Sequence, residues 1–137
     1  MKPKRVDHIA VAVRDLGAAL AFFRDRLGLE VEHVATVEQD RVRVAFLPVG
    51  ETHLELLEPL DGEGPIARFL ERRGEGLHHI CLEVDNIRAA LEELGAAGVE
   101  LIDREPRPGA EGLVAFIHPK SSRGVLLELV QKPGEVS

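Results

Sequence analysis

An internal repeat is the feature of this sequence that most constrains its fold. Residues 6–13, with the sequence VDHIAVAV, have a counterpart in residues 77–84, with the sequence LHHICLEV. Both segments continue into a residue that favours a helix start and then into an apolar pattern with helical spacing. His8 and His79 therefore occupy equivalent positions, 71 residues apart.

A second match lies further along both halves. The tripeptide Leu-Glu-Leu occurs at residues 54–56 and again at 127–129, which makes Glu55 and Glu128 equivalent at a spacing of 73 residues. A period near 70 is too long for a solenoid, whose repeats run from about 20 to 50 residues. We therefore predict a duplicated half-domain, with a single domain over residues 1–137 that contains one module at about 5–60 and another at about 76–132.

Each module has the residue pattern of a β-α-β-β-β unit. Strand residues alternate between larger aliphatic side chains and smaller or polar ones, and each helix has an N-cap residue before it and a glycine after it. The first module has predicted strands at 7–13, 29–37, 42–47 and 52–58, with a helix between Asp15 and Gly28. The second has predicted strands at 77–84, 99–104, 113–118 and 125–130, with a helix that Asn86 caps and Gly98 ends. A short helix at 66–73 joins the modules, so the predicted fold class is α+β.

Charge and composition exclude several classes of function. The chain has a formal net charge of −7, whereas a general nucleic-acid-binding surface needs a basic footprint. It has no apolar run long enough to span a bilayer, and residues 1–5 lead directly into the first predicted strand. We therefore expect no nucleic-acid partner, no membrane insertion and a cytoplasmic location. Cys81 is the single cysteine, which excludes an intrachain disulfide.

Glu128 is the strongest local anomaly in the sequence. It stands inside residues 125–130, a run that otherwise has the pattern of a strand buried on both faces, where an unpartnered carboxylate is costly. A metal ion, a cationic partner or protonation of the carboxyl group would each compensate. Two histidines from equivalent first strands and two glutamates from equivalent last strands form a mixed nitrogen and oxygen donor set that suits a divalent first-row metal. Four such ligands on an octahedral ion would leave two adjacent positions for a bidentate substrate.

Six segments carry a resemblance to a known family, namely 6–13, 54–60, 64–70, 74–80, 106–110 and 118–121. In these segments, which extend over nearly the whole chain, the sequence resembles the methylmalonyl-CoA epimerases of the vicinal oxygen chelate superfamily. The resemblance implies two paired β-α-β-β-β modules that form a curved mixed sheet around a metal site. It also implies a homodimer and a coenzyme A thioester substrate.

The implied activity is a metal-dependent epimerisation. It interconverts (2R)- and (2S)-methylmalonyl-CoA by removing and returning the C2 proton through an enolate, which a metal would stabilise by polarising the carboxylate and thioester oxygens. The metal ligands that the resemblance implies are His8, Glu55, His79 and Glu128. Co²⁺ is the first choice of ion, with Mn²⁺, Ni²⁺, Zn²⁺ and Mg²⁺ as alternatives.

Epimerisation needs an acid and a base on opposite faces of C2. The resemblance implies Glu128 as one of the two groups. Some relatives carry a second glutamate on the third strand, but Val44 stands at the matched position of this chain. Glu38 is the nearest acid in the chain and is our candidate for the second group. His53, two residues from Glu55, is a further candidate for a proton relay.

Basic loop residues are the candidates for contacts with the coenzyme A phosphates, because ammonium and guanidinium groups both suit phosphate. These residues are Lys120, Arg107 and Arg123, with Arg104 nearby in the sequence. Two other functions remain open for the same fold. One is another enzyme of this architecture, such as a glyoxalase I or a dioxygenase, and the other is a non-catalytic protein that binds a small molecule or a metal.

Overall fold

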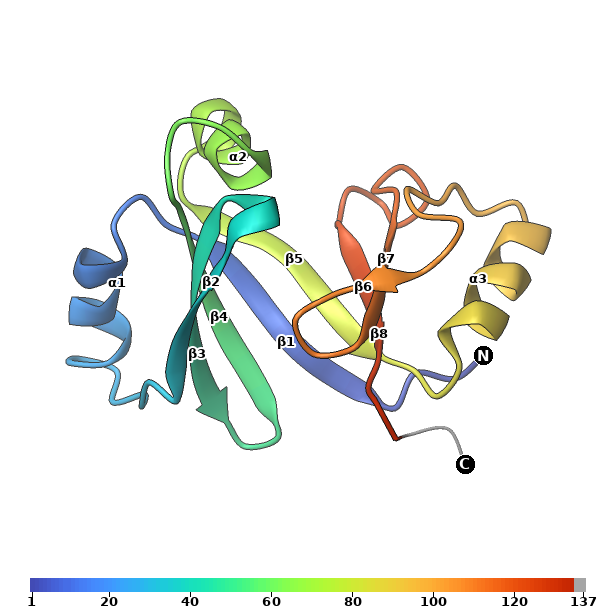
Figure 1. Cartoon of the computed structure of the whole chain (residues 1–137), viewed down its shortest axis with the longest axis horizontal. Helices are drawn as coiled ribbons and strands as arrows, with labels where there is room; N and C mark the ends of the chain where they lie inside the picture. The colour runs from blue at the N-terminus through green and yellow to red at the C-terminus, as the bar shows by residue number, and fades with distance from the viewer. Residues whose placement is uncertain (135–137) are drawn as a thin grey trace. The chain divides into compact units, whose positions relative to one another are not determined.

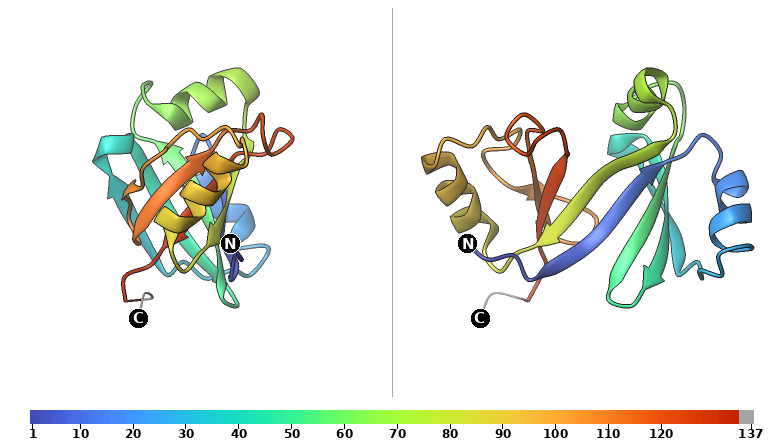
Figure 2. Two further views of the ribbon diagram at one scale, coloured as in Figure 1. Left: turned by 90° about the vertical axis from the view of Figure 1, so that its right-hand side faces the viewer. Right: turned by 180° about the vertical axis from the view of Figure 1, so that it is seen from behind.

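The computed structural model describes residues 1–134, which form three α-helices and eight strands (Figure 1; Figure 2 gives two further views). The elements are β1 (Arg5–Ala12), α1 (Leu16–Phe23), β2 (His33–Val37), the 3₁₀ helix η1 (Glu38–Asp40), β3 (Val42–Val49), β4 (Thr52–Pro59), α2 (Pro65–Arg73), β5 (Gly76–Glu83), α3 (Ile87–Ala96), β6 (Arg107–Pro108), β7 (Leu113–Ile117) and β8 (Leu127–Gln131). They group into two compact units. One runs from His8 to His78, and the other combines Met1–Asp7 with residues 79–134. No helix within the described residues is long and apolar enough to cross a membrane.

The unit from His8 to His78 contains neighbouring strands in the order β2-β3-β4-β1. β1 and β4 are parallel, whereas the other neighbours are antiparallel. One face packs against α1 through a core that includes Leu20 and Leu56. The opposite face packs against α2 through a core that includes Ala10 and Leu70. Glu55 is the register partner of Ala10, so the Glu55 side chain lies on the face that α2 covers.

The unit of the second module repeats this arrangement, with the strand order β5-β8-β7-β6. β5 and β8 are parallel, and the other neighbours are antiparallel. One face packs against α3 through a core that includes Leu129. The opposite face carries the buried side chains of Cys81 and Val130. Glu128 is the register partner of both Cys81 and Phe116, so it lies on this second face. The predicted α+β fold of two β-α-β-β-β modules is confirmed.

The helix N-caps follow the sequence prediction. The Asp15 side chain accepts a hydrogen bond from Ala18 N at 2.9 Å, and the Asn86 side chain accepts one from Ala89 N at 3.0 Å. Each bond satisfies a backbone N–H that has no partner within its own helix. Both helices therefore start one residue after the predicted cap.

A second pair of contacts anchors the same helix starts to the last strand of each module. Glu58 Oε2 accepts a hydrogen bond from Leu16 N at 2.7 Å, and Gln131 Oε1 accepts one from Ile87 N at 2.8 Å. Glu58 and Gln131 are 73 residues apart, and each follows a candidate metal-binding glutamate by three residues. The duplication thus includes a helix anchor that the sequence did not reveal.

The predicted strand at 29–37 is shorter in the structure, where β2 begins at His33. Leu29 and Val31 pack against the α1 core, and their backbone does not join the strand ladder. The burial of these two side chains gave the segment the apolar pattern of a strand.

The strand predicted at 99–104 is wrong. This segment contributes one isolated bridge, between Leu101 and Ile117. Asp103 Oδ2 accepts the Phe116 N–H at 2.8 Å, so a side chain occupies a position that a strand carbonyl would take in a continuous ladder. The short strand β6 instead lies inside the predicted loop at 106–112.

The first seven residues belong to the unit of the second module. Lys4 N donates to Glu83 O at 2.8 Å, and Arg5 Nε lies 3.1 Å from Glu83 Oε1. The N-terminal ammonium group of Met1 lies 2.9 Å from Glu93 Oε1. These contacts hold the start of β1 against the end of β5 and against α3.

Candidate functional site

The first module brings His8 of β1 together with Glu55 of β4. His8 Nδ1 lies 3.2 Å from Glu55 Oε2, and both residues are buried, with 8% and 7% of their surface exposed. The parallel register of β1 and β4 places His8 beside His53 and Ala10 beside Glu55, which directs the two side chains to one face. The small side chain of Ala10 leaves space for this contact.

The second module brings His79 of β5 together with Glu128 of β8. His79 Nε2 lies 3.0 Å from Glu128 Oε1, and the residues are 7% and 8% exposed. Phe116, opposite Glu128 on β7, presents its ring edge-to-face to His79, with the ring centroids 5.5 Å apart. Cys81, the register partner of Glu128, is fully buried, as expected for a small residue beside the site.

Each module therefore contains the same buried pair, formed by a histidine from its first strand and a glutamate from its last strand. The imidazole in each pair contacts the buried carboxylate. This contact gives Glu128 the partner that a buried carboxylate needs. Imidazole nitrogen and carboxylate oxygen are both ligands for divalent first-row metals. The chemistry of the two pairs fits the predicted ligand set of His8, Glu55, His79 and Glu128.

Glu38 and Val44 lie in different environments. Glu38 is exposed in the 3₁₀ helix η1, where its backbone carbonyl accepts the Arg41 N–H at 3.1 Å. Val44 is 5% exposed and packs in the core that α2 covers. His53 Nε2 lies 3.1 Å from Glu32 Oε1, so the histidine two residues before Glu55 has an acidic partner of its own.

The basic residues expected at the coenzyme A phosphates fall into two groups. Lys120 and Arg123 are in the exposed turn between β7 and β8, where Lys120 N donates to His118 Nδ1 at 3.0 Å. Arg107 is on β6, and its Nε lies 3.3 Å from Asp103 Oδ1. The sequence did not single out Asp103, although its spacing of four residues from Arg107 is compatible with an ion pair.

A cluster of buried charges lies at the far end of β5. Glu83 and Asp7 are 1% and 2% exposed, and Glu83 contacts Lys4 and Arg5. Lys132 Nζ lies 2.6 Å from Asp7 Oδ1. Partial burial opposes the charge on Lys132, but the hydrogen bond and attraction from Asp7, with further attraction from Glu83, raise its pKa above the ordinary value.

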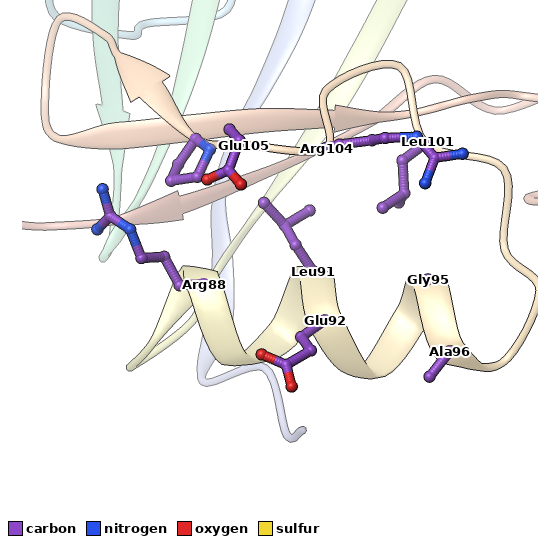
Figure 3. A pocket seen from close by; sticks show the side chains of 9 residues that line it. Arg88, Leu91, Glu92, Gly95, Ala96, Leu101, Arg104 and Glu105 are labelled. Atoms are coloured by element: carbon purple, nitrogen blue, oxygen red, sulfur yellow. The ribbon is translucent and has the colours of Figure 1, made fainter.

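A surface pocket of about 400 Å³ lies between α3 and the segment before β6. Figure 3 shows Leu91 projecting from α3 toward this segment, while Arg88 and Arg104 carry the cationic groups of the lining. Glu92 and Glu105 also line the pocket, so its charges are mixed. The lining does not include His79 or Glu128.

The duplicated topology and the repeated His–Glu pairs define a class of α+β proteins built from two β-α-β-β-β modules. The chain belongs to the Glyoxalase/Bleomycin resistance protein/Dioxygenase superfamily, whose family model matches residues 7–116.

The relatives of the chain indicate a more specific group within this superfamily. It is 45% identical over 130 residues to the ethylmalonyl-CoA/methylmalonyl-CoA epimerase of Cereibacter sphaeroides, with 93% of this chain and 97% of the relative covered. It is 44% identical over 129 residues to the mitochondrial methylmalonyl-CoA epimerase of Mus musculus, with 93% and 72% covered. A solved structure of methylmalonyl-CoA epimerase in complex with methylmalonyl-CoA and NH4+ is 36% identical, with a TM-score of 0.90 and 99% of both chains covered. These findings confirm the predicted family.

Proposed function

We propose that this protein is an epimerase that interconverts (2R)- and (2S)-methylmalonyl-CoA by removing and returning the proton at C2. The observation that carries the proposal is the 43–45% identity, over 93% of this chain, to proteins named as methylmalonyl-CoA epimerases. A fold match of TM-score 0.90 to a structure that holds methylmalonyl-CoA supports the same substrate class, a coenzyme A thioester.

The proposed metal ligands are His8, Glu55, His79 and Glu128, acting together on one divalent cation. Three observations support this set: the equivalence of the pairs in the duplicated sequence, their burial, and the His–Glu contact within each module. When bound, the ion would supply Lewis-acid polarisation of the substrate oxygens, which is worth several kcal/mol in such sites. Co²⁺ is the proposed ion, with Mn²⁺, Ni²⁺, Zn²⁺ and Mg²⁺ as alternatives, and the imidazole nitrogens favour the transition metals among them.

Glu128 is the proposed group that moves a proton at one face of C2. Glu128 is buried, and its contact with His79 holds the carboxylate in a fixed position. A carboxylate that is positioned in this way and shielded from most water is suited to proton transfer. Glu38 is the proposed group at the opposite face. Its exposed position on η1 would require the substrate to approach that turn.

Lys120, Arg107 and Arg123 are the proposed cationic contacts for the coenzyme A portion, with Lys120 and Arg123 in the exposed turn after β7 best suited to phosphates. The proposed assembly is a homodimer and the proposed location is the cytoplasm. The net charge of −7 supports a protein without a nucleic-acid partner.

The experiment that tests the proposed function is deuterium uptake at C2 of methylmalonyl-CoA in heavy water, followed by mass spectrometry. The metal-loaded protein should exchange the C2 proton, and a chelator should abolish the exchange. A fully metallated protein that gives no exchange above the buffer rate would refute the proposal.

A further inference from the structure

Phe116 of β7 packs against the imidazole ring of His79, a candidate metal ligand of the second module. The two ring planes meet at 84°, and the ring centroids are 5.5 Å apart. His79 Nε2 also lies 3.0 Å from Glu128 Oε1, and Glu128 is the register partner of Phe116. Two neighbours therefore hold the imidazole, a carboxylate at one ring nitrogen and an aromatic ring in an edge-to-face contact.

Phe116 is itself held by the segment that replaces the predicted strand at 99–104. Phe116 N donates to Asp103 Oδ2 at 2.8 Å, and Phe116 O accepts the N–H groups of Ile102 and Asp103 at 3.0 and 3.2 Å. The guanidinium group of Arg107 lies over the ring, with its Cζ 5.6 Å from the ring centroid. Hydrogen bonds at both backbone groups and a cation–π contact thus restrain the side chain that contacts His79.

The equivalent phenylalanine of the first module has different ring partners. Phe46 lies opposite Glu55 in the register of β3 and β4, so the repeat extends to the residue across from each candidate metal-binding glutamate. Within residues 1–134, the aromatic contacts of the Phe46 ring are with His33, at a centroid distance of 4.3 Å, and with His53, at 6.4 Å. Both partners are outside the proposed ligand set, whereas Phe116 contacts a proposed ligand.

The orientation of a histidine ring depends on its neighbours. The torsion that turns the ring about its Cβ–Cγ bond has a broad energy profile, so packing contacts decide where the ring nitrogens point. Residues that hold a metal-binding histidine in place commonly contribute about 10- to 100-fold to metal affinity. His79 is 7% exposed, so its contacts with Phe116 and Glu128 form much of its immediate environment.

We propose that Phe116 is a positioning residue of the metal site, whose ring holds the His79 imidazole in the orientation that makes a ring nitrogen available to the divalent cation. This inference rests on the proposed function, and specifically on its metal ligands. It assigns different roles to the two equivalent phenylalanines. Phe116 orients a ligand, whereas Phe46 belongs to the core that α2 covers.

The test measures the Kd of Co²⁺ for the full chain by isothermal titration calorimetry. Phe116→Leu should raise this Kd by about 10- to 100-fold, because the ring that restrains His79 is lost. Phe116→Tyr keeps the ring and should restore tight binding. The matched control, Phe46→Leu, removes the equivalent ring of the first module and should leave the Kd close to that of the wild type. If Phe116→Leu does not fold, Phe116→Met carries the same expectation, because its flexible side chain fills irregular space without an aromatic ring.

The visible absorption spectrum of bound Co²⁺ provides a readout that a loss of core packing alone would not change. The bands depend on the ligand geometry around the ion, so they should shift in Phe116→Leu and return in Phe116→Tyr. An unchanged Kd or an unchanged spectrum in Phe116→Leu would overturn the inference. Equal weakening of Co²⁺ binding by Phe46→Leu would also overturn it, because the effect would then be one of general packing.

These outcomes are separate from those that test the proposed function. A wild type that binds Co²⁺ but exchanges no C2 proton would refute the proposed function, and the comparison of Kd values would still decide the inference. A wild type that exchanges the C2 proton but binds no Co²⁺ would refute the inference and leave the epimerase activity in place.

Discussion

Gln131 offers a sharp test of the helix anchors, because the side chain of one residue accepts the first N–H of α3. Ile87, the donor, is fully buried, and its N–H has no acceptor within the helix. Gln131→Met keeps most of the side-chain volume but removes the acceptor. Gln131→Glu keeps an acceptor and copies the arrangement of Glu58 at the start of α1.

The expected size of the effect follows from the burial of this N–H. A buried donor left without its acceptor costs about 1–3 kcal/mol of unfolding free energy. For a chain of 137 residues, this corresponds to a fall of about 3–12 °C in Tm. Gln131→Glu should match or exceed the wild type, because a negative charge at a helix N-terminus contributes about 0.3–1 kcal/mol.

Urea unfolding followed by circular dichroism measures these free energies in metal-free protein. The slope against urea should stay constant among the variants, so that the midpoint reports stability. Equal stability of Gln131→Met and wild type would refute the argument that the bond anchors α3. If Gln131→Met and Gln131→Glu lose the same free energy of unfolding, the whole amide group, and not its acceptor oxygen alone, stabilises the start of α3.

Three further predictions concern the site and the buried charges. Co²⁺ at 100 times its Kd should raise the unfolding free energy of the wild type by about 2.7 kcal/mol, and Glu128→Ala should lose most of this gain in a thermal scan. Glu38→Gln should slow the interconversion of the two methylmalonyl-CoA epimers by about 10²–10⁴-fold, the usual contribution of a proton-transfer group. The pKa of Lys132 is raised beside Asp7, so their pairing stabilises the fold at neutral pH and up to the ordinary lysine pKa of 10.5, and this stabilisation is lost as the pH rises through the folded-state pKa. Lys132→Met should therefore lose less stability than the wild type at alkaline pH.

Each of these predictions has a control or a contradicting result. Glu100→Gln, which changes a half-exposed carboxylate near His118, should keep the full response to Co²⁺. A Co²⁺ response that survives in Glu128→Ala would remove Glu128 from the ligand set. Normal interconversion of the epimers by Glu38→Gln would end its proposed role. Identical alkaline unfolding curves for Lys132→Met and wild type would show that the Asp7 contact does not contribute to the pH dependence.

The four candidate residues could be identified from the sequence, because duplication displays equivalent residues as a repeat: His8 matches His79, and Glu55 matches Glu128. The contact between histidine and glutamate within each module comes from the structure, because it depends on the parallel pairing of strands that are tens of residues apart. Alternating apolar residues also predicted the strands that bear them, because each face packs against a different core.

Other parts of the site depend on tertiary contacts that leave little trace in the sequence. Gln131 at the end of a strand has the sequence character of a solvated residue, and only the position of Ile87 gives it a partner. Asp103 replaces a strand carbonyl, so the apolar residues around it had the pattern of a strand that does not form. Arg107 had the features of a loop cation, because the turn-rich composition around it concealed the two-residue strand β6.

The central claim is that the two duplicated pairs act as one metal site. Elemental analysis measures this most directly, on protein that has been saturated with Co²⁺ and then freed of excess ion. The account predicts one tightly bound ion per chain, lost on substitution of either His8 or His79 by alanine. Two ions per chain, each removed independently by one substitution, would show that the pairs bind separately and would contradict the account, as would a chain that retains no ion.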